Sequence, residues 1–226
     1  MRMRRKPNLY PRLERVAALS IPDPAALKGR WAEVYPEYKE IRLEIGCGKG
    51  RFTCEQAQRE PEVLLIAVEK IADAMVVAME RAQAQNIANV RFVDGDAEDM
   101  TDWFAPGELS RIYINFPDPW RKARQYKRRL TAEDFLNRYH VLLPKGGQVW
   151  FKTDNVPLYE WSMESFAASG WSVAPMPEGT PLTDYEAKFI EQGLPIHRVV
   201  ATRPEQDSAV TSFAYAWGHR PEGDAE

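Results

Sequence analysis

Apolar residues along this chain follow two patterns that alternate from residue 41 onward. Short continuous apolar runs predict strands, and these runs lie at residues 41–45, 63–68, 90–93, 111–115, 148–153, 171–174 and 196–201. Three-to-four spacing of apolar residues predicts helices, which we place at residues 50–59, 72–85, 132–142, 158–168 and 184–192. The run Val63–Val68 contains no polar residue, which is typical of a strand buried on both faces.

Because strands and helices alternate, we predict an α/β protein with a doubly wound, mostly parallel sheet. The final helix and strand depart from this rhythm, so we expect the last strand to run antiparallel. At 226 residues the chain has the length of one domain, which we place at residues 28–202. Residues 1–27 are basic and proline-rich and are predicted to form an N-terminal arm. Residues 203–226 are predicted to be a partly disordered extension, with an edge strand at Val210–Trp217.

Composition is ordinary for a soluble protein, with 44% hydrophobic and 28% charged residues. No apolar run approaches the length of a membrane span, and the N-terminus lacks the apolar segment of a signal peptide. The two cysteines, Cys47 and Cys54, have no metal-ligand pattern around them. We therefore expect a reduced, cytoplasmic protein with neither a membrane partner nor a metal.

Positive charge is concentrated in two short segments, although the net charge is −3. Residues 1–15 hold six Lys/Arg and one acid, and residues 121–129 hold six Lys/Arg and no acid. The rest of the chain carries 18 basic and 32 acidic residues. Such segregation predicts local contact with phosphate groups. The alternative is a solvated charged surface together with a disordered basic tail, and for Arg2–Lys6 the two interpretations stay open.

The first predicted strand runs into a glycine-rich turn, residues 44–50, in which Gly46, Gly48 and Gly50 follow the acid Glu44. Glycines permit a tight turn and close approach of a ligand to the backbone, and a predicted helix follows at once. The G-x-G-x-G spacing differs from the G-x-G-x-x-G of dinucleotide enzymes and lacks the G-K-[ST] end of a P-loop. In doubly wound sheets ligands bind at this edge, so the turn indicates a nucleoside-binding site.

Two further acids follow the next two predicted strands. Glu69 ends the second strand, where a carboxylate can accept hydrogen bonds from both hydroxyls of a ribose. Asp96 follows the third strand, where it could accept a hydrogen bond from an adenine amino group. Each acid also has a structural alternative, because Asp96 could cap a helix and Glu69 could be a charge at a helix N-terminus. The joint pattern with the glycine turn favours a cofactor site.

The fourth predicted strand ends in Asn115–Trp120, a turn that carries the carboxylate Asp118 between two prolines. The prolines prevent continuation of a central strand and restrict the shape of the turn. The basic segment 121–129 follows directly, so the pattern indicates chemistry on a nucleic acid. Phe116 and Trp120 fit turn packing better than base stacking, and no histidine has the spacing of a ligand or a catalytic triad.

Taken together, five motifs resemble the bacterial tRNA (guanine-N7)-methyltransferases, within the class I S-adenosylmethionine-dependent methyltransferases. The resemblance covers roughly residues 28–200, and its motifs are Glu44–Gly50, Phe116–Trp120 with Lys122, Lys127–Arg129, Phe151–Asp154 and Thr183–Lys188. It implies transfer of a methyl group from S-adenosylmethionine to N7 of a guanine in the variable loop of tRNA, position 46 in tRNA numbering. The family often has a histidine in the basic segment, where this chain has Gln125 and Tyr126.

The resemblance also implies roles for particular residues. The expected cofactor contacts are Glu44, Gly46, Gly48, Gly50, Glu69, Asp96 and Asp118. The expected substrate contacts are Lys122, Asp154, Thr183, Asp184, Tyr185 and Glu186, and the expected RNA contacts are Arg124, Gln125, Tyr126, Lys127, Arg128 and Arg129. Structural alternatives stay open here too, since Thr183 and Glu186 have the spacing of a capping box and Asp154 could cap a helix.

The chemistry of guanine N7 assigns Asp118 a catalytic role. N7 is an unprotonated acceptor at neutral pH, so an in-line methyl transfer needs no strong base. Catalysis then depends on positioning and on a desolvated site. Asp118 could align the guanine through its N1 and N2 protons and stabilise the positive charge that develops on the purine, with Asp154 as a second orienting acid.

Three other functions remain open from the sequence. The same fold could methylate a different RNA, a small molecule or a protein, with the basic segment merely solvated. The chain could be an RNA-binding module without catalysis, although the acids Glu44, Glu69 and Asp96 disfavour that. A dinucleotide oxidoreductase is disfavoured by the glycine spacing. The sequence leaves a monomer and a homodimer equally open.

Overall fold

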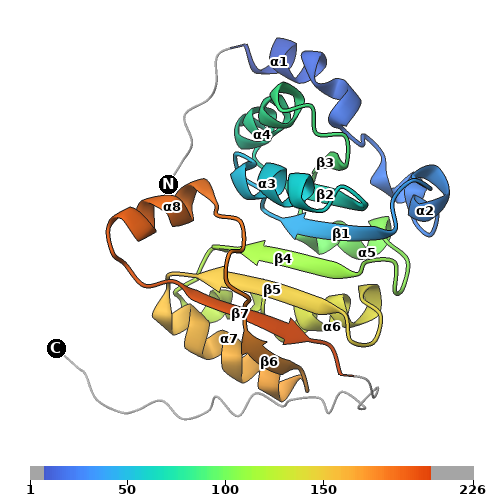
Figure 1. Ribbon diagram of the computed structural model, residues 1–226. Coiled ribbons are helices and arrows are strands. Elements are labelled where there is room, and N and C mark those ends of the chain that lie inside the picture. The colour runs from blue at the N-terminus through green and yellow to red at the C-terminus, as the bar shows by residue number, and fades with distance from the viewer. Residues whose placement is uncertain (1–7, 205–226) are drawn as a thin grey trace, which may run out of the picture.

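The computed structural model describes residues 8–204, which form a seven-stranded sheet with helices on both faces (Figure 1). The strand order is β3-β2-β1-β4-β5-β7-β6. The strands are β1 (Glu40–Ile45), β2 (Val63–Glu69), β3 (Val90–Asp94), β4 (Arg111–Asn115), β5 (Gln148–Thr153), β6 (Ser172–Pro175) and β7 (His197–Thr202). Strands β1 to β5 pair in parallel, and β7 runs antiparallel to both β5 and β6. The predicted fold class and the antiparallel last strand are confirmed.

The helices that connect these strands also match the predicted ones to within a few residues. The α-helices are α1 (Leu9–Arg15), α2 (Trp31–Val34), α3 (Arg51–Arg59), α4 (Ala72–Ala84), α5 (Met100–Trp103), α6 (Glu133–Leu142), α7 (Val156–Ala168) and α8 (Asp184–Glu191). The 3₁₀ helices are η1 (Ala17–Leu19), η2 (Pro24–Leu27), η3 (Ala97–Asp99) and η4 (Ala123–Arg128). The sequence did not predict α1, α2, α5 or the 3₁₀ helices. The basic segment 121–129 includes η4.

Strand β2 separates the two halves of the core because its side chains alternate between the faces of the sheet. Leu64 and Ile66 pack in one cluster with residues of α2, α5, α6 and α7. Leu65 and Ala67 pack in the other with residues of α3 and α4. Every residue of β2 is buried, as the apolar run at 63–68 predicted. The strand ends that follow are therefore held rigidly at the edge of the sheet.

The N-terminal residues that the structure describes pack on one side of this core. Val16 is buried against β3 and α4, and the Ile21 amide donates to the Phe92 carbonyl over 2.8 Å. The Arg12 guanidinium forms an ion pair with Glu80 on α4. The basic residues Arg2–Lys6 and the expected edge strand at Val210–Trp217 lie outside the described residues.

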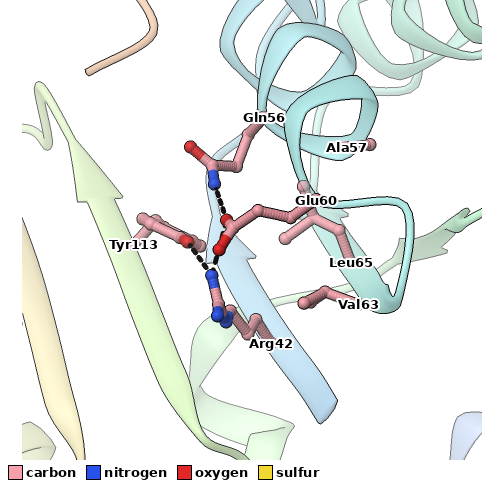
Figure 2. Close-up of a pocket in the computed structure, with 7 residues that line it drawn as sticks. All are labelled: Arg42, Gln56, Ala57, Glu60, Val63, Leu65 and Tyr113. Carbon is pink, nitrogen blue, oxygen red and sulfur yellow. Dashed lines mark hydrogen bonds and ion pairs between the residues drawn. The ribbon is translucent and has the colours of Figure 1, made fainter. Parts of the chain in front are cut away.

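A charged cluster fills the space beside the start of β1 (Figure 2). Arg42 donates to the Glu60 carboxylate at 2.6 Å and to the Tyr113 hydroxyl at 3.0 Å. Gln56 also donates to Glu60, and Glu40 completes the set with an ion pair to Arg42 at 2.8 Å. These contacts join β1, β4 and α3 at the amino end of the sheet.

In the described part of the chain, no helix combines the length and the apolar character needed to cross a bilayer.

Candidate active site

The carboxyl ends of the parallel strands meet at one edge of the sheet, and most of the expected cofactor and substrate residues gather there. The register pairs Glu69 with Asp94 and Asn115 with Lys152, so residues at or next to the ends of neighbouring strands lie side by side. Helix α8 lies beyond the ends to which the β1, β4 and β5 arrows point (Figure 1). Topology therefore brings together segments that are up to about 140 residues apart, from Glu44 to Asp184.

The glycine turn after β1 leaves open space above its backbone. Gly46 has a φ of 76° and Gly48 a φ of 57°, and a Cβ atom at either position would meet no other atom within 4 Å. Gly50 differs, because its Cβ would lie 2.6 Å from the Cβ of Ala78. Gly46 and Gly48 thus leave room for a ligand, whereas Gly50 permits α3 to pack closely on α4.

The carboxylate of Glu69 ties this turn to the end of β2. It accepts hydrogen bonds from the Gly48 amide at 3.0 Å and from the Ile71 amide at 2.9 Å. Asp96 lies at the end of the following strand, where it caps η3 through the Glu98 amide and lies 3.5 Å from Lys70. The structural alternative for Asp96 is therefore present in the structure, but half of the side chain stays exposed at the site.

Glu44 lies beneath the turn and is almost fully buried. Its carboxylate accepts hydrogen bonds from the Thr53 hydroxyl at 2.6 Å and from the Asn115 amide at 3.2 Å. Burial raises the pKa of Glu44 to about 7, because these two neutral donors and the positive charge of Lys152 offset only part of the lost hydration. Through Asn115, the first residue of the turn 115–120 that carries Asp118, the Glu44 carboxylate is connected to that turn.

The turn that carries Asp118 is held in an unusual backbone conformation. Phe116 has a φ of 53° and Trp120 a φ of 42°, and non-glycine residues in this region cost about 1–3 kcal/mol each. The Phe116 amide donates to the Lys152 carbonyl at 2.8 Å, which fixes the start of the turn on β5. Asp118 is exposed at the tip. Strain of this kind persists where the surroundings hold it, and it is typical of functional sites.

Among the expected substrate residues, Asp154 and Tyr185 lie together beside this turn. The Tyr185 hydroxyl donates to the Asp154 carboxylate at 3.4 Å, and burial together with that carboxylate raises the pKa of Tyr185. The Tyr185 ring contacts Phe116 edge to face with centroids 5.1 Å apart, yet 45% of Tyr185 stays exposed. Phe116 therefore packs against Tyr185, in line with the turn-packing interpretation.

Thr183 and Glu186 form the capping box of α8, and Glu186 is fully buried. The Glu186 carboxylate accepts hydrogen bonds from Lys152 at 3.0 Å and from Arg198 at 2.8 Å. Asp184 forms an ion pair with Arg81 of α4 at 3.1 Å. Substrate contact by Thr183, Asp184 and Glu186 stays a prediction, and the burial of Glu186 favours a role in holding α8 at the site.

The basic segment divides into exposed and buried residues. The exposed cations are Arg121, Lys122, Arg124, Lys127 and Arg128, while Gln125 and Tyr126 are partly buried. Arg128 lies over the ring of Trp120 at 5.1 Å. Arg129 is only 4% exposed, so RNA contact by its side chain stays a prediction that its burial disfavours.

The sequence analysis gave no individual role to three residues of the site, although Asn115 and Lys152 lie within motifs that it identified. Thr53 and Asn115 bind Glu44, and Lys152 binds Glu186 and lies over the Phe52 ring. A signal was present only for Lys152, because a lysine inside an apolar strand must find a buried partner. Thr53 and Asn115 are ordinary residues for a helix and for the end of a strand.

Comparison with known proteins places this site in a family. The sequence family described as "Putative methyltransferase" matches residues 38–199. The chain belongs to this methyltransferase family. It is 42% identical over 193 residues to a protein named tRNA (guanine-N(7)-)-methyltransferase in Lachnoclostridium phytofermentans, covering 81% of this chain and 90% of the relative. A protein of the same name in Geobacillus thermodenitrificans is 39% identical over 92% of this chain and all of its own length.

Solved methyltransferase structures share the fold at low sequence identity. The 16S rRNA methyltransferase KamB superposes with a TM-score of 0.58 at 15% identity, over 77% of this chain and 92% of its own. A precorrin-6y C5,15-methyltransferase from Geobacter metallireducens has a TM-score of 0.53 at 14% identity, over 85% of this chain and 88% of its own. The methyltransferase fold is therefore present here, and the family rather than the fold points to the substrate.

Proposed function

We propose that this methyltransferase transfers a methyl group from S-adenosylmethionine to N7 of a guanine in the variable loop of tRNA. The observation that carries the proposal is the 39–42% identity, over 81–92% of the chain, to relatives named tRNA (guanine-N(7)-)-methyltransferase. The site supports it, since an open glycine turn and a strained turn carrying Asp118 lie at the same edge of the sheet. The enzyme would act on tRNA in the cytoplasm, as a monomer or a homodimer.

The residues at the carboxyl edge fit S-adenosylmethionine. The open space above Gly46 and Gly48 admits a ligand close to the backbone. Glu69 and Asp96 offer carboxylate oxygens to a ribose and an adenine, and Glu44 and Asp118 bring negative charge toward a cation. When bound, the cofactor supplies an electrophilic methyl group on a positively charged sulfonium.

Asp118 has the position and the charge to orient the guanine. Its carboxylate lies exposed at the tip of the turn, where it can accept from the N1 and N2 protons of the base. Those contacts would turn N7 toward the cofactor side and stabilise the positive charge that the purine gains. N7 carries a free lone pair at neutral pH, so no residue needs to remove a proton.

Asp154, Tyr185 and Lys122 would complete the substrate side. Tyr185 presents an exposed aromatic ring held by Phe116 and Asp154, a surface on which an unstacked base can lie. Lys122 lies exposed at the start of η4, next to the catalytic turn. Arg124, Lys127 and Arg128 extend this positive surface and would contact tRNA phosphates.

The test is transfer of labelled methyl groups from S-adenosylmethionine to unmodified tRNA. We expect labelled RNA, loss of the label when the tRNA is digested with RNase beforehand, and loss of the label when the variable-loop guanine is replaced by adenine. Label that survives RNase treatment would favour a small-molecule or protein substrate. Cofactor binding without any transfer to tRNA would favour a non-catalytic RNA-binding protein.

A further inference from the structure

Arg129 is a charged residue of the basic segment that the proposed function does not use. The residue is 4% exposed, in contrast to the neighbouring Lys127 and Arg128. A phosphate group reaches an arginine through its N–H donors, and those donors must face solvent in the free protein. Two of the three guanidinium nitrogens of Arg129, Nε and Nη2, donate to backbone carbonyls of the protein, so the side chain serves the protein itself.

The partners of Arg129 are the last two carbonyls of the catalytic turn. Its Nε donates to the carbonyl of Pro119 at 3.0 Å, and its Nη2 donates to the carbonyl of Trp120 at 3.4 Å. Among the residues that the structure describes, the backbone of residues 117–121 makes no hydrogen bonds other than these two. The start of the turn is fixed separately, through the bond from the Phe116 amide to β5.

The guanidinium itself is held in place by two aromatic rings. Arg129 lies over the Tyr126 ring at 3.7 Å and over the Trp161 ring of α7 at 4.6 Å. The two ring centroids are 6.0 Å apart. Burial lowers the pKa of Arg129, but the ordinary pKa of an arginine is so high that the side chain stays charged at neutral pH. A planar cation stacked on rings while it donates from its edge is an arrangement that lysine cannot reproduce.

We infer that Arg129 is a positioning residue for catalysis, which connects α7 and η4 to the strained turn and so sets the place of Asp118. Asp118 lies between Phe116 and Trp120, the two residues of this turn that have a positive φ, so the turn needs support on both sides. Strand β5 supplies the support on one side and Arg129 on the other. This inference rests on the proposed function for its kinetic readout.

The experiment compares Arg129→Lys, Arg129→Gln and Arg128→Gln in the full-length protein, with wild type measured first on unmodified tRNA. For both Arg129 variants we expect kcat to fall about 10- to 100-fold, while the KM for tRNA and its salt dependence stay near those of wild type. For Arg128→Gln we expect a higher KM for tRNA and a weaker salt dependence. If Arg129→Lys kept the wild-type kcat, the inference would be wrong. If Arg129→Gln changed only KM and the salt dependence, Arg129 would be an RNA contact and the inference would be wrong as well.

Trp161→Leu provides a second variant if the Arg129 variants do not fold, since it removes one stacking ring without changing the charge. We expect a smaller loss of kcat with an unchanged salt dependence, and a wild-type kcat would contradict the inference.

Hydrogen exchange of the peptide spanning residues 114–121 gives a readout without tRNA. We expect faster exchange in Arg129→Lys than in Arg30→Gln, an exposed control at the N-cap of α2. Unchanged exchange would overturn the inference, whereas a wild type that methylates no tRNA while exchange does increase would overturn the proposed function alone.

Discussion

The two ends of strand β1 place opposite charges in opposite surroundings. Arg42 and Glu44 are two residues apart, so they point to the same face of the sheet, and both are buried. Arg42 forms ion pairs with Glu40 and Glu60, so its charge is compensated within the protein. Glu44 has the neutral donors Thr53 and Asn115 instead.

This difference favours the carboxyl end as the proposed ligand site. A buried charge with charged partners is neutralised by the fold and needs nothing else. The carboxylate of Glu44 has neutral hydrogen-bond donors, so under the proposed function a cationic cofactor would compensate its charge. The amino end therefore holds the sheet together, and the carboxyl end is where we propose that the chemistry takes place.

The largest effect is expected from Asp118→Asn, which keeps the shape of the side chain and removes its charge. We expect kcat to fall about 100- to 1000-fold, because the charge on the purine loses its stabilising carboxylate. Asp118 is exposed, so the melting temperature should stay within a few degrees of wild type. Single-turnover rates at saturating cofactor measure the effect, and a wild-type rate would remove Asp118 from the chemical step.

Glu44→Gln should change how stability depends on pH. The raised pKa means that folded protein holds a proton between about pH 4.5 and 7 that unfolded protein has lost, so wild-type stability falls as pH rises through this window. The loss amounts to roughly 3 kcal/mol relative to Glu44→Gln. Urea unfolding of both proteins at several pH values measures it.

The same carboxylate should couple pH to cofactor affinity. Positive charge from the cofactor favours the ionised form of Glu44, so wild type should bind S-adenosylmethionine more tightly as pH rises from 6 to 8. Glu44→Gln should lose that dependence. If the affinity for S-adenosylmethionine depended on pH in the same way in both proteins, the charge of Glu44 would have no influence on cofactor binding.

At the other end, Arg42→Met should affect stability and leave chemistry alone. We expect the free energy of unfolding to fall by about 2 kcal/mol, since the partly exposed Glu40 and Glu60 lose their shared cation. The kcat should stay within about twofold of wild type, because the cluster lies at the opposite edge of the sheet from Asp118. A large drop in kcat with normal stability would contradict the assignment of a structural role to the amino end of the strands.

The smallest effect concerns the exposed cations Lys127 and Arg128. Replacing both by glutamine should weaken tRNA binding about tenfold at moderate salt and reduce the slope of log Kd against log salt by roughly 1.5. Fluorescence titrations at several salt concentrations measure both quantities. An unchanged slope would remove these residues from the phosphate contacts.

The sheet could be predicted from the sequence because its strands are short runs of buried apolar residues, as in Val63–Val68. The short elements could not. Helix α2 has four residues and forms because Trp31 is fully buried and its indole donates to the Trp103 carbonyl at 2.9 Å. Such contacts join residues far apart in the sequence, so no local pattern reveals them.

The candidate site divides in the same way. The acids Glu69, Asp96 and Asp118 could be predicted because parallel topology brings strand ends to one edge. The burial of Arg129 and Glu186 could not, since it depends on partners such as Trp161 and Arg198 that only the fold brings near. A run of cations shows where charge lies in a chain, and only the packing shows which of them face solvent.

The central claim is that the carboxyl edge of the sheet methylates guanine N7 in tRNA. The most direct measurement incubates the full-length protein with S-adenosylmethionine and unmodified tRNA, then maps modified nucleosides by mass spectrometry of RNase fragments. The account predicts 7-methylguanosine in the variable-loop fragment, and its near absence when Asp118→Asn replaces wild type. A tRNA without 7-methylguanosine, or with the methyl group on another atom or another loop, would contradict it.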